Sequence, residues 1–235
     1  MALKGMIFDL DGVLTDTAKY HYLAWKKIAD SLGLSFNDAD NELLKGVSRI
    51  RSFEIILELN NVSDKYSAEE KERLVNLKNE YYKEMIEQLT PKEILEGVLP
   101  LLSEAAENGI KCAVASVSKN AFRVLELLEI KNKFDYIADA NAVTKSKPDP
   151  EIFLDCVCNM GLKPCECIGF EDSQAGIEAI HSAGMMSVGI GVAVTSVEPD
   201  MALKSTSELS FKKIADFYNN FISQCSEITD LTNIF

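Results

Sequence analysis

Residues 7–17, which read IFDLDGVLTDT, decide the fold and place two carboxylates at one point of it. The apolar residues before Asp9 are typical of a buried strand, and Gly12 lets the backbone turn sharply just beyond it. Side chains two residues apart in extended chain point the same way, so Asp9 and Asp11 are expected to face one bound molecule. Because two ionised carboxylates repel each other unless a cation or a shared proton compensates, the stretch favours a divalent-metal site.

An Asp-x-Asp-Gly sequence also occurs in calcium-binding loops and in ordinary turns. An EF-hand loop that began at Asp9 would need a Glu at its twelfth position, but that position is Tyr20. An ordinary turn remains an alternative on these residues alone. The functional interpretation gains support from three further polar clusters downstream, each of which follows a predicted strand.

The composition is that of a globular protein, with 47% hydrophobic and 26% charged residues. A net charge of -13 argues against nucleic-acid and acidic-membrane partners, because the long-range field would repel both. Any anionic ligand must then be held by local cations. No apolar stretch reaches the length of a membrane span, and the N-terminus lacks a signal-peptide pattern. We therefore expect a cytoplasmic, monomeric protein with a small-molecule ligand.

The six cysteines include two Cys-x-Cys pairs, Cys156 with Cys158 and Cys165 with Cys167. Zinc sites more often have two-residue spacers, and two residues that are two apart on a helix face away from each other. Reduced, packed thiols are therefore expected.

Residues 17–92 are rich in helical patterns and poor in strand patterns. Apolar residues recur there every three to four positions, and Ser67 with Glu70 reads as a capping box at a helix start. The pattern predicts a helical domain of residues 17–92, inserted after the first strand into a core made of residues 1–16 and 93–235.

From about residue 94 the pattern alternates between strands and helices. Such alternation predicts the α/β class, with a doubly wound parallel sheet that carries helices on both faces. Ligands of such sheets bind beyond the carboxyl ends of the strands. The last dozen residues, 224–235, show no clear pattern and are expected to fray.

Two of the downstream clusters suit a phosphate. Residues 116–120, SVSKN, are expected to open a helix, where backbone N–H groups and the Ser116 hydroxyl suit a phosphate oxygen; Ser118 is equally typical of a helix cap. Lys147 follows the next strand region and could neutralise a phosphate and Asp9 together. The alternative for Lys147 is a solvated side chain before a helix that starts with proline.

The third cluster is acidic. Glu171 and Asp172 end a predicted strand and fit metal ligation, although acids there also stabilise the start of the next helix. Together the four clusters supply a nucleophile, a donor for a phosphate oxygen, a counter-cation and a metal site at one edge of one sheet. This set is suited to phosphoryl transfer through an aspartyl phosphate.

On residues 9–13, 116–120, 147 and 171–176 the chain resembles the haloacid dehalogenase superfamily of aspartate-nucleophile phosphotransferases. The resemblance implies a Rossmann-like core with an inserted helical cap. It implies that Asp9 attacks phosphorus, that Asp11 is the general acid and base, and that Ser116 and Lys147 grip the phosphoryl group. It also implies Mg²⁺ as the cofactor, held by Asp9, Asp11 through its backbone carbonyl, and Asp172, with Glu171 alongside.

The helical segment should then close over the strand ends as a lid. Residues 44–52, LKGVSRIRS, put cations around a glycine and suit a second phosphate; alternatively, Gly46 ends a helix and the cations lie on the surface. The resemblance implies substrate contacts from Thr17, His21, Lys45, Gly46, Val47, Ser48, Arg49, Ser52, Lys78, Val117, Ser118, Lys119 and Asn120, with His21 orienting Asp11.

Within the superfamily the resemblance is to sugar phosphomutases, which interconvert β-D-glucose 1-phosphate and D-glucose 6-phosphate through the 1,6-bisphosphate. A mutase must bind the bisphosphate in both orientations and must keep water from the aspartyl phosphate. A phosphomonoester hydrolase with the same core, acting on a sugar phosphate, is the alternative. A phospho-aspartate signalling module is a third, which the lid and the acid at Asp11 argue against.

Overall fold

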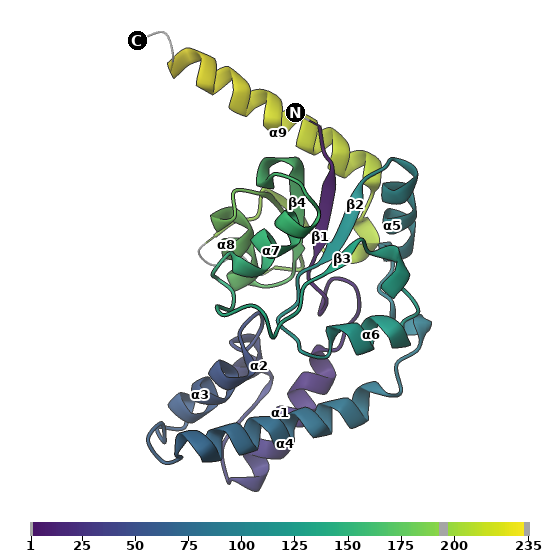
Figure 1. The fold of residues 1–235 in the computed structure, drawn as a ribbon. Helices are drawn as coiled ribbons and strands as arrows, with labels where there is room; N and C mark the ends of the chain where they lie inside the picture. Colours follow the sequence, from purple (N-terminus) through teal and green to yellow (C-terminus); the bar gives the residue numbers. More distant parts are fainter. Residues whose placement is uncertain (1, 193–196, 233–235) are drawn as a thin grey trace.

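A computed structural model describes residues 2–192 and 197–232, with side chains as far as residue 221 (Figure 1). Within these residues one sheet of six parallel strands has the order β3-β2-β1-β4-β5-β6, so the first strand of the chain lies near its centre. The strands are β1 (Gly5–Phe8), β2 (Lys111–Val114), β3 (Tyr136–Ile137), β4 (Cys167–Glu171), β5 (Met186–Ile190) and β6 (Met201–Leu203).

Helices cover both faces of the sheet. On β1 the side chains of Met6 and Phe8 belong to one buried cluster and Ile7 to another, because successive side chains of a strand face opposite sides. The first cluster includes residues of α5 (Val98–Glu107), α6 (Ala121–Leu127) and α9 (Phe211–Thr232), and the second includes residues of α7 (Glu151–Asn159) and α8 (Gln174–Ser182). The predicted doubly wound α/β sheet is confirmed.

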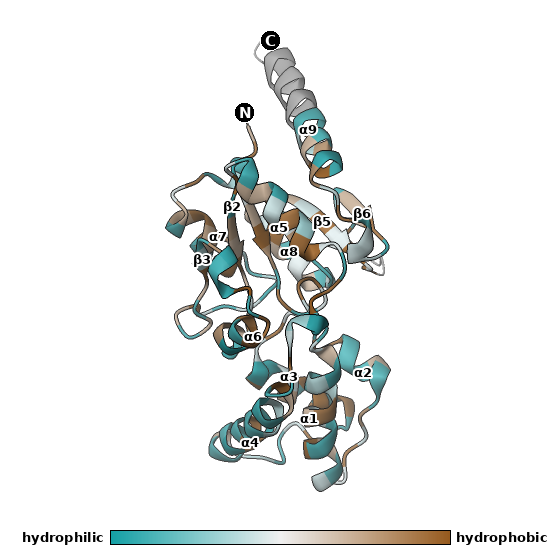
Figure 2. Cartoon of the chain, turned by 90° about the vertical axis from the view of Figure 1, so that its right-hand side faces the viewer, coloured by the Kyte–Doolittle hydropathy of each residue, from teal (hydrophilic) through white to brown (hydrophobic). Residues whose placement is uncertain are grey.

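Four helices between β1 and β2 stand apart from the sheet in Figure 1: α1 (Ala18–Ser31), α2 (Asp38–Glu42), α3 (Arg49–Leu59) and α4 (Ala68–Ile86). They share a separate apolar cluster around Trp25, Phe53 and Leu74. Helix α4 begins with the capping box of Ser67 and Glu70, and its outer side is largely hydrophilic in Figure 2. The chain leaves the sheet for these helices near residue 17 and returns to it near residue 92.

Three local expectations need correction. Helix α6 begins at Ala121 after an Asn120 whose side chain makes no capping bond, so residues 116–120 form a loop rather than the start of a helix. Strand β6 and helix α9 were not predicted. Helix α9 continues through residues 224–232, where no pattern was recognised, and residues 233–235 lie outside the described part of the chain.

Five of the six cysteines have described side chains, and all five are free thiols. The side chain of Cys225 lies outside the described set. Among the described residues, no helix has the length and apolar character that crossing a membrane requires.

Candidate active site

The register of the central strand places Asp9 between the ends of two neighbouring strands. Phe8 pairs with Val114 of β2 on one side and with Phe170 of β4 on the other. The Asp9 amide continues the ladder by donating to the Phe170 carbonyl at 2.9 Å. Parallel pairing therefore brings the residues just after β2 and β4 to either side of Asp9.

Gly12 allows the loop after β1 to approach Asp172. Its φ of 80° lies in the left-handed region that favours glycine. A Cβ atom at this position would lie 2.3 Å from Oδ2 of Asp172. Any other residue here would push the Asp11 loop away from the acid at the end of β4.

Both oxygens of the Asp9 carboxylate have a donor. Nζ of Lys147 donates to Oδ1 at 2.6 Å, and the Asp11 amide donates to Oδ2 at 3.0 Å. Lys147 is buried and also donates to the Ala115 carbonyl at 3.0 Å and to the Glu171 carboxylate. The ammonium group of Lys147 thus holds the Asp9 carboxylate in position. Its own charge is paired with Asp9 and Glu171, away from solvent.

The two acids at the end of β4, Glu171 and Asp172, have different surroundings. Glu171 is buried and accepts hydrogen bonds from the Ser173 hydroxyl and amide as well as from Lys147. Asp172 lines the pocket, and its Oδ2 lies 3.1 Å from Nζ of Lys45 in the helical segment. The Lys45 ion pair therefore joins the helical segment to the strand ends.

The charges around Asp9 do not balance. Oxygen atoms of Asp9, Glu171 and Asp172 lie within 4.8 Å of one another and could hold a metal ion. Counting Asp11 as well, four carboxylates cluster here, and within the described residues the ammonium groups that pair with them are those of Lys147 and Lys45, while the charge of Lys78 also acts on Asp11. Burial, followed by the Glu171 carboxylate, raises the pKa of Asp172 to about 6. A hard divalent cation with oxygen ligands would remove this excess, so the residues fit the expected metal.

Asp11 faces a neutral histidine. Burial, and then the Lys78 charge, lowers the pKa of His21 well below its ordinary value. Nζ of Lys78 lies 2.8 Å from Nδ1 of His21, and burial, followed by the Arg49 charge, lowers the pKa of Lys78 to about 7. When Lys78 is charged it can only donate, so Nδ1 accepts and Nε2 carries the proton of the neutral histidine. That Nε2 lies 3.9 Å from Oδ2 of Asp11. Among the described residues, Nε2 of His21 and Oδ1 of Asp11 are buried without a hydrogen-bond partner, so both can meet a substrate hydroxyl.

The proton on Asp11 is expected to stabilise the metal-free protein at acid pH, and this contribution is lost as the pH rises to neutral. Burial, and then the Asp172 carboxylate, raises the pKa of Asp11 from 3.8 to about 7. The folded state holds this proton more tightly than the unfolded chain. The resulting stabilisation is fully present below the unfolded pKa and is lost as the pH rises through the folded one.

Urea unfolding in a chelating buffer between about pH 4 and pH 7 measures this dependence. The difference in unfolding free energy between the original protein and the Asp11→Asn variant should fall as the pH rises through this range, because the variant lacks the proton that Asp11 holds. A difference that is constant or rises over this range would contradict the raised pKa.

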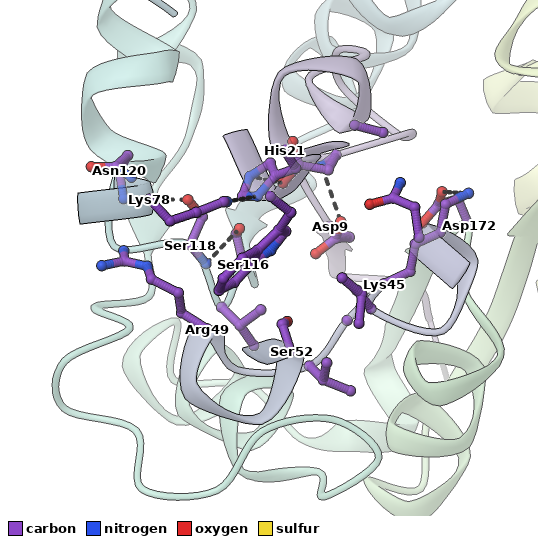
Figure 3. Close-up of a pocket in the computed structure, with 18 of the residues that line it drawn as sticks. Asp9, His21, Lys45, Arg49, Ser52, Lys78, Ser116, Ser118, Asn120 and Asp172 are labelled. Atoms are coloured by element: carbon purple, nitrogen blue, oxygen red, sulfur yellow. Dashed lines mark hydrogen bonds and ion pairs between the residues drawn. The ribbon is translucent and has the colours of Figure 1, made fainter. Parts of the chain in front are cut away.

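One pocket joins this centre to the helical segment. Figure 3 shows Asp9, Lys45 and Asp172 on one side of it and Lys78, Arg49 and Asn120 on the other. Within the described part of the chain no carboxylate pairs with Arg49, whereas Arg51, two residues along α3, pairs with Glu58 on the surface. Arg49 is therefore available for an anion in the pocket.

Most of the predicted site residues line this pocket. They are Asp9, Asp11, His21, Lys45, Gly46, Val47, Arg49, Ser52, Lys78, Ser116, Val117, Ser118, Asn120 and Asp172. Lys147 and Glu171 are buried and do not line the pocket; Lys147 donates to Asp9 and to Glu171. Thr17 is buried and accepts from the Tyr82 hydroxyl at 3.4 Å. Ser48 caps α3, and the side chain of Lys119 is exposed, so these two do not reach the pocket.

Sequence reasoning missed five residues that line the pocket: Ala18, Trp25, Asn41, Leu44 and Asn79. Trp25 belongs to the apolar helical periodicity of residues 17–92, and Leu44 opens the stretch 44–52 but was not expected to contact the substrate. Asn79 directly follows Lys78 on α4, and that adjacency is the signal that could have drawn attention to it. Nothing in the local sequence marks Asn41 or Ala18.

The chain belongs to the haloacid dehalogenase-like hydrolases, whose family model matches residues 3–184. The predicted resemblance is confirmed. The match covers β1 through α8 and so includes each of the four polar clusters.

Relatives of known name extend the likeness. A β-phosphoglucomutase from Bacillus subtilis (strain 168) is 41% identical over 219 residues, which are 93% of this chain and 97% of that protein. The crystal structure of a β-phosphoglucomutase from Clostridium difficile matches with a TM-score of 0.91 at 45% identity, over 94% of this chain and 99% of that one. A fructose-1-phosphate phosphatase from Escherichia coli (strain K12) is 32% identical over 79% of this chain and 95% of that protein.

Proposed function

We propose that the chain is a phosphomutase that interconverts β-D-glucose 1-phosphate and D-glucose 6-phosphate through phosphorylated Asp9 and the 1,6-bisphosphate. The main support is that one pocket contains both the carboxylate centre and the guanidinium of Arg49, which pairs with no carboxylate of the described residues. A bisphosphate needs both, because one end must reach Asp9 while the other is bound. The identity of 41% with a β-phosphoglucomutase supports the proposal.

The chemistry divides into two mirror-image steps. An oxygen of Asp9 forms a bond to phosphorus while the bond from phosphorus to the sugar oxygen breaks, and Asp11 gives its proton to that oxygen. In the other step the free hydroxyl of a sugar monophosphate attacks the phosphorus of phosphorylated Asp9, the bond from phosphorus to the Asp9 oxygen breaks, and Asp11 takes up the hydroxyl proton, so that the 1,6-bisphosphate forms. The bisphosphate turns end for end between the two steps, so that the phosphoryl group it returns to Asp9 comes from the other end of the sugar. We propose that Lys147, which donates to Asp9, and Ser116, which lines the pocket, hold the phosphoryl oxygens in both steps.

We propose Mg²⁺ as the metal. Asp9, Asp172 and the backbone carbonyl of Asp11 would hold it, with Glu171 alongside, and oxygen ligands of this kind suit it. When bound, it supplies positive charge that stabilises the transferring phosphoryl group.

We further propose that residues 17–92 are a cap domain on a core of residues 1–16 and 93–235. Two pairs cross from one to the other beside the pocket: Lys45 with Asp172 at 3.1 Å, and Asn79 with Asn120 at 2.9 Å. In this arrangement the helices cover the strand ends. Such closure would keep water from the phosphorylated Asp9.

Arg49→Ala is expected to weaken binding of the sugar phosphate by about 1.5 to 3 kcal/mol, the range for a charged hydrogen bond. The physical reason is that the guanidinium lies at the end of the pocket away from Asp172 and, within the described residues, pairs with no carboxylate. Steady-state kinetics should show the loss mainly in KM. Arg51→Ala is the matched control, because that side chain pairs with Glu58 on the surface. Equal kinetic constants for the two variants would show that Arg49 does not bind the substrate.

Phosphorus NMR tests the proposed function. The protein is mixed with β-glucose 1-phosphate, Mg²⁺ and a trace of the bisphosphate. Conversion to glucose 6-phosphate supports the mutase. Accumulation of inorganic phosphate as the main product supports the hydrolase instead, and the absence of any product contradicts both.

A further inference from the structure

The cap and the core meet along a seam between α4 and α6, where two polar pairs cross. On the inner side, Nδ2 of Asn120 donates to Oδ1 of Asn79 at 2.9 Å, and both residues line the pocket. On the outer side, Nε of Arg123 donates to the Glu87 carboxylate at 2.9 Å. About half of each side chain in the outer pair is exposed, and neither lines the pocket.

The amide of Asn120 is not used by its own helix. Asn120 is the residue before α6, a place where asparagine side chains often cap, yet here its side chain makes no capping bond. The bond to Asn79 is its one side-chain hydrogen bond within the described residues. The remaining amide atoms of the pair are therefore available to the pocket.

The location of this pair matches one end of the substrate. Figure 3 shows Asn120 on the same side of the pocket as Arg49 and Lys78, and away from Asp172. An uncharged amide N–H is a suitable donor for a phosphate oxygen beside a guanidinium. Because Asn79 belongs to the helical segment and Asn120 to the core, their bond forms only when the two meet.

We propose that Asn79 is a positioning residue, which turns the amide of Asn120 toward the phosphate that is not being transferred as the cap closes. The inference rests on the proposed function and adds a residue to it. The distal phosphate site is then complete only when the cap is closed. The bond between Asn79 and Asn120 does not strengthen the binding of a ligand that lacks a distal phosphate.

The test compares two phosphoryl donors of Asp9, with Mg²⁺ present. The 1,6-bisphosphate has a distal phosphate, whereas acetyl phosphate has none. Asn79→Ala is expected to slow phosphorylation by the bisphosphate roughly tenfold, the effect of losing one hydrogen bond to a charged group, and to change the rate with acetyl phosphate less than twofold. The double variant Asn79→Ala, Asn120→Ala should be no slower than Asn120→Ala alone, because Asn79 acts through Asn120.

Arg123→Gln is the matched control. It weakens the same seam without touching the pocket, so its effect should be small and equal for the two donors. Equal losses with both donors in Asn79→Ala, or additive losses in the double variant, would overturn the inference. Failure of the proposed function is distinguishable, since the original protein would then form no glucose 6-phosphate.

Discussion

Asp9→Asn is expected to abolish phosphoryl transfer, with a loss in kcat of roughly 10⁴-fold or more, the scale seen when a catalytic nucleophile is removed. The amide keeps the shape of the side chain but has no charged oxygen with which to attack phosphorus. Lys147 and the Asp11 amide hold that oxygen in place in the original protein. Intact-mass measurement after addition of the bisphosphate should show no added phosphoryl group on the variant.

Asp64→Asn makes the same chemical change at an exposed position of the helical segment and should leave phosphorylation unchanged. A phosphoryl group retained by Asp9→Asn, located on another residue by peptide mapping, would show that the nucleophile has been misassigned.

Lys147→Met is expected to lower the free energy of unfolding by about 3 to 5 kcal/mol, because it leaves buried carboxylates without their cation. The two carboxylates concerned are those of Asp9 and Glu171. The rate of phosphoryl transfer should also fall, by roughly 10²- to 10³-fold, because one positive charge beside the phosphoryl oxygens is lost. Urea unfolding and steady-state kinetics measure the two effects separately.

Lys145→Met is the control for this variant. Lys145 lies two residues away, but its side chain is 68% exposed and pairs with Asp149 on the surface. Removing such a pair should cost about 1 kcal/mol or less. If Lys147→Met were as stable and as active as Lys145→Met, the buried ammonium would have neither role.

Much of the carboxylate centre could be predicted because a parallel sheet aligns the ends of its strands. Once residues 5–8 are recognised as the first strand, the residues after the neighbouring strands must lie near Asp9. Ser116 and Asp172 do line the same pocket, and Lys147 reaches Asp9 at 2.6 Å. No knowledge of side-chain packing was needed for that step.

Contacts between the cap and the core could not be predicted in the same way. The pairing of Asn79 with Asn120 and that of Lys45 with Asp172 depend on how the helices sit over the sheet. No local periodicity contains that information. The burial of Lys147 could not be predicted either, because a lysine before a proline is ordinarily solvated. Only the fold of its loop brings the side chain into contact with Asp9, away from solvent.

The elements missed at the C-terminus have a different cause. Strand β6 has three residues, too few for a period-two pattern to stand out. Helix α9 does have a start signal, because Ser210 directly precedes it and its hydroxyl accepts from the Lys213 amide at 3.5 Å. Ile214 and Tyr218, four residues apart, are both buried against the core. The short strand could not be recognised by its pattern, whereas the helix carried signals that were overlooked.

The most direct measurement follows a labelled phosphoryl group from sugar to protein to sugar. The protein is phosphorylated by bisphosphate labelled with ³²P, separated from excess donor, and then mixed with unlabelled β-glucose 1-phosphate. We predict that the label is found on the peptide containing Asp9 and then passes to glucose bisphosphate and glucose 6-phosphate. Release of the label as inorganic phosphate before it reaches a sugar, or its absence from Asp9, would contradict a phosphomutase that works through this aspartate.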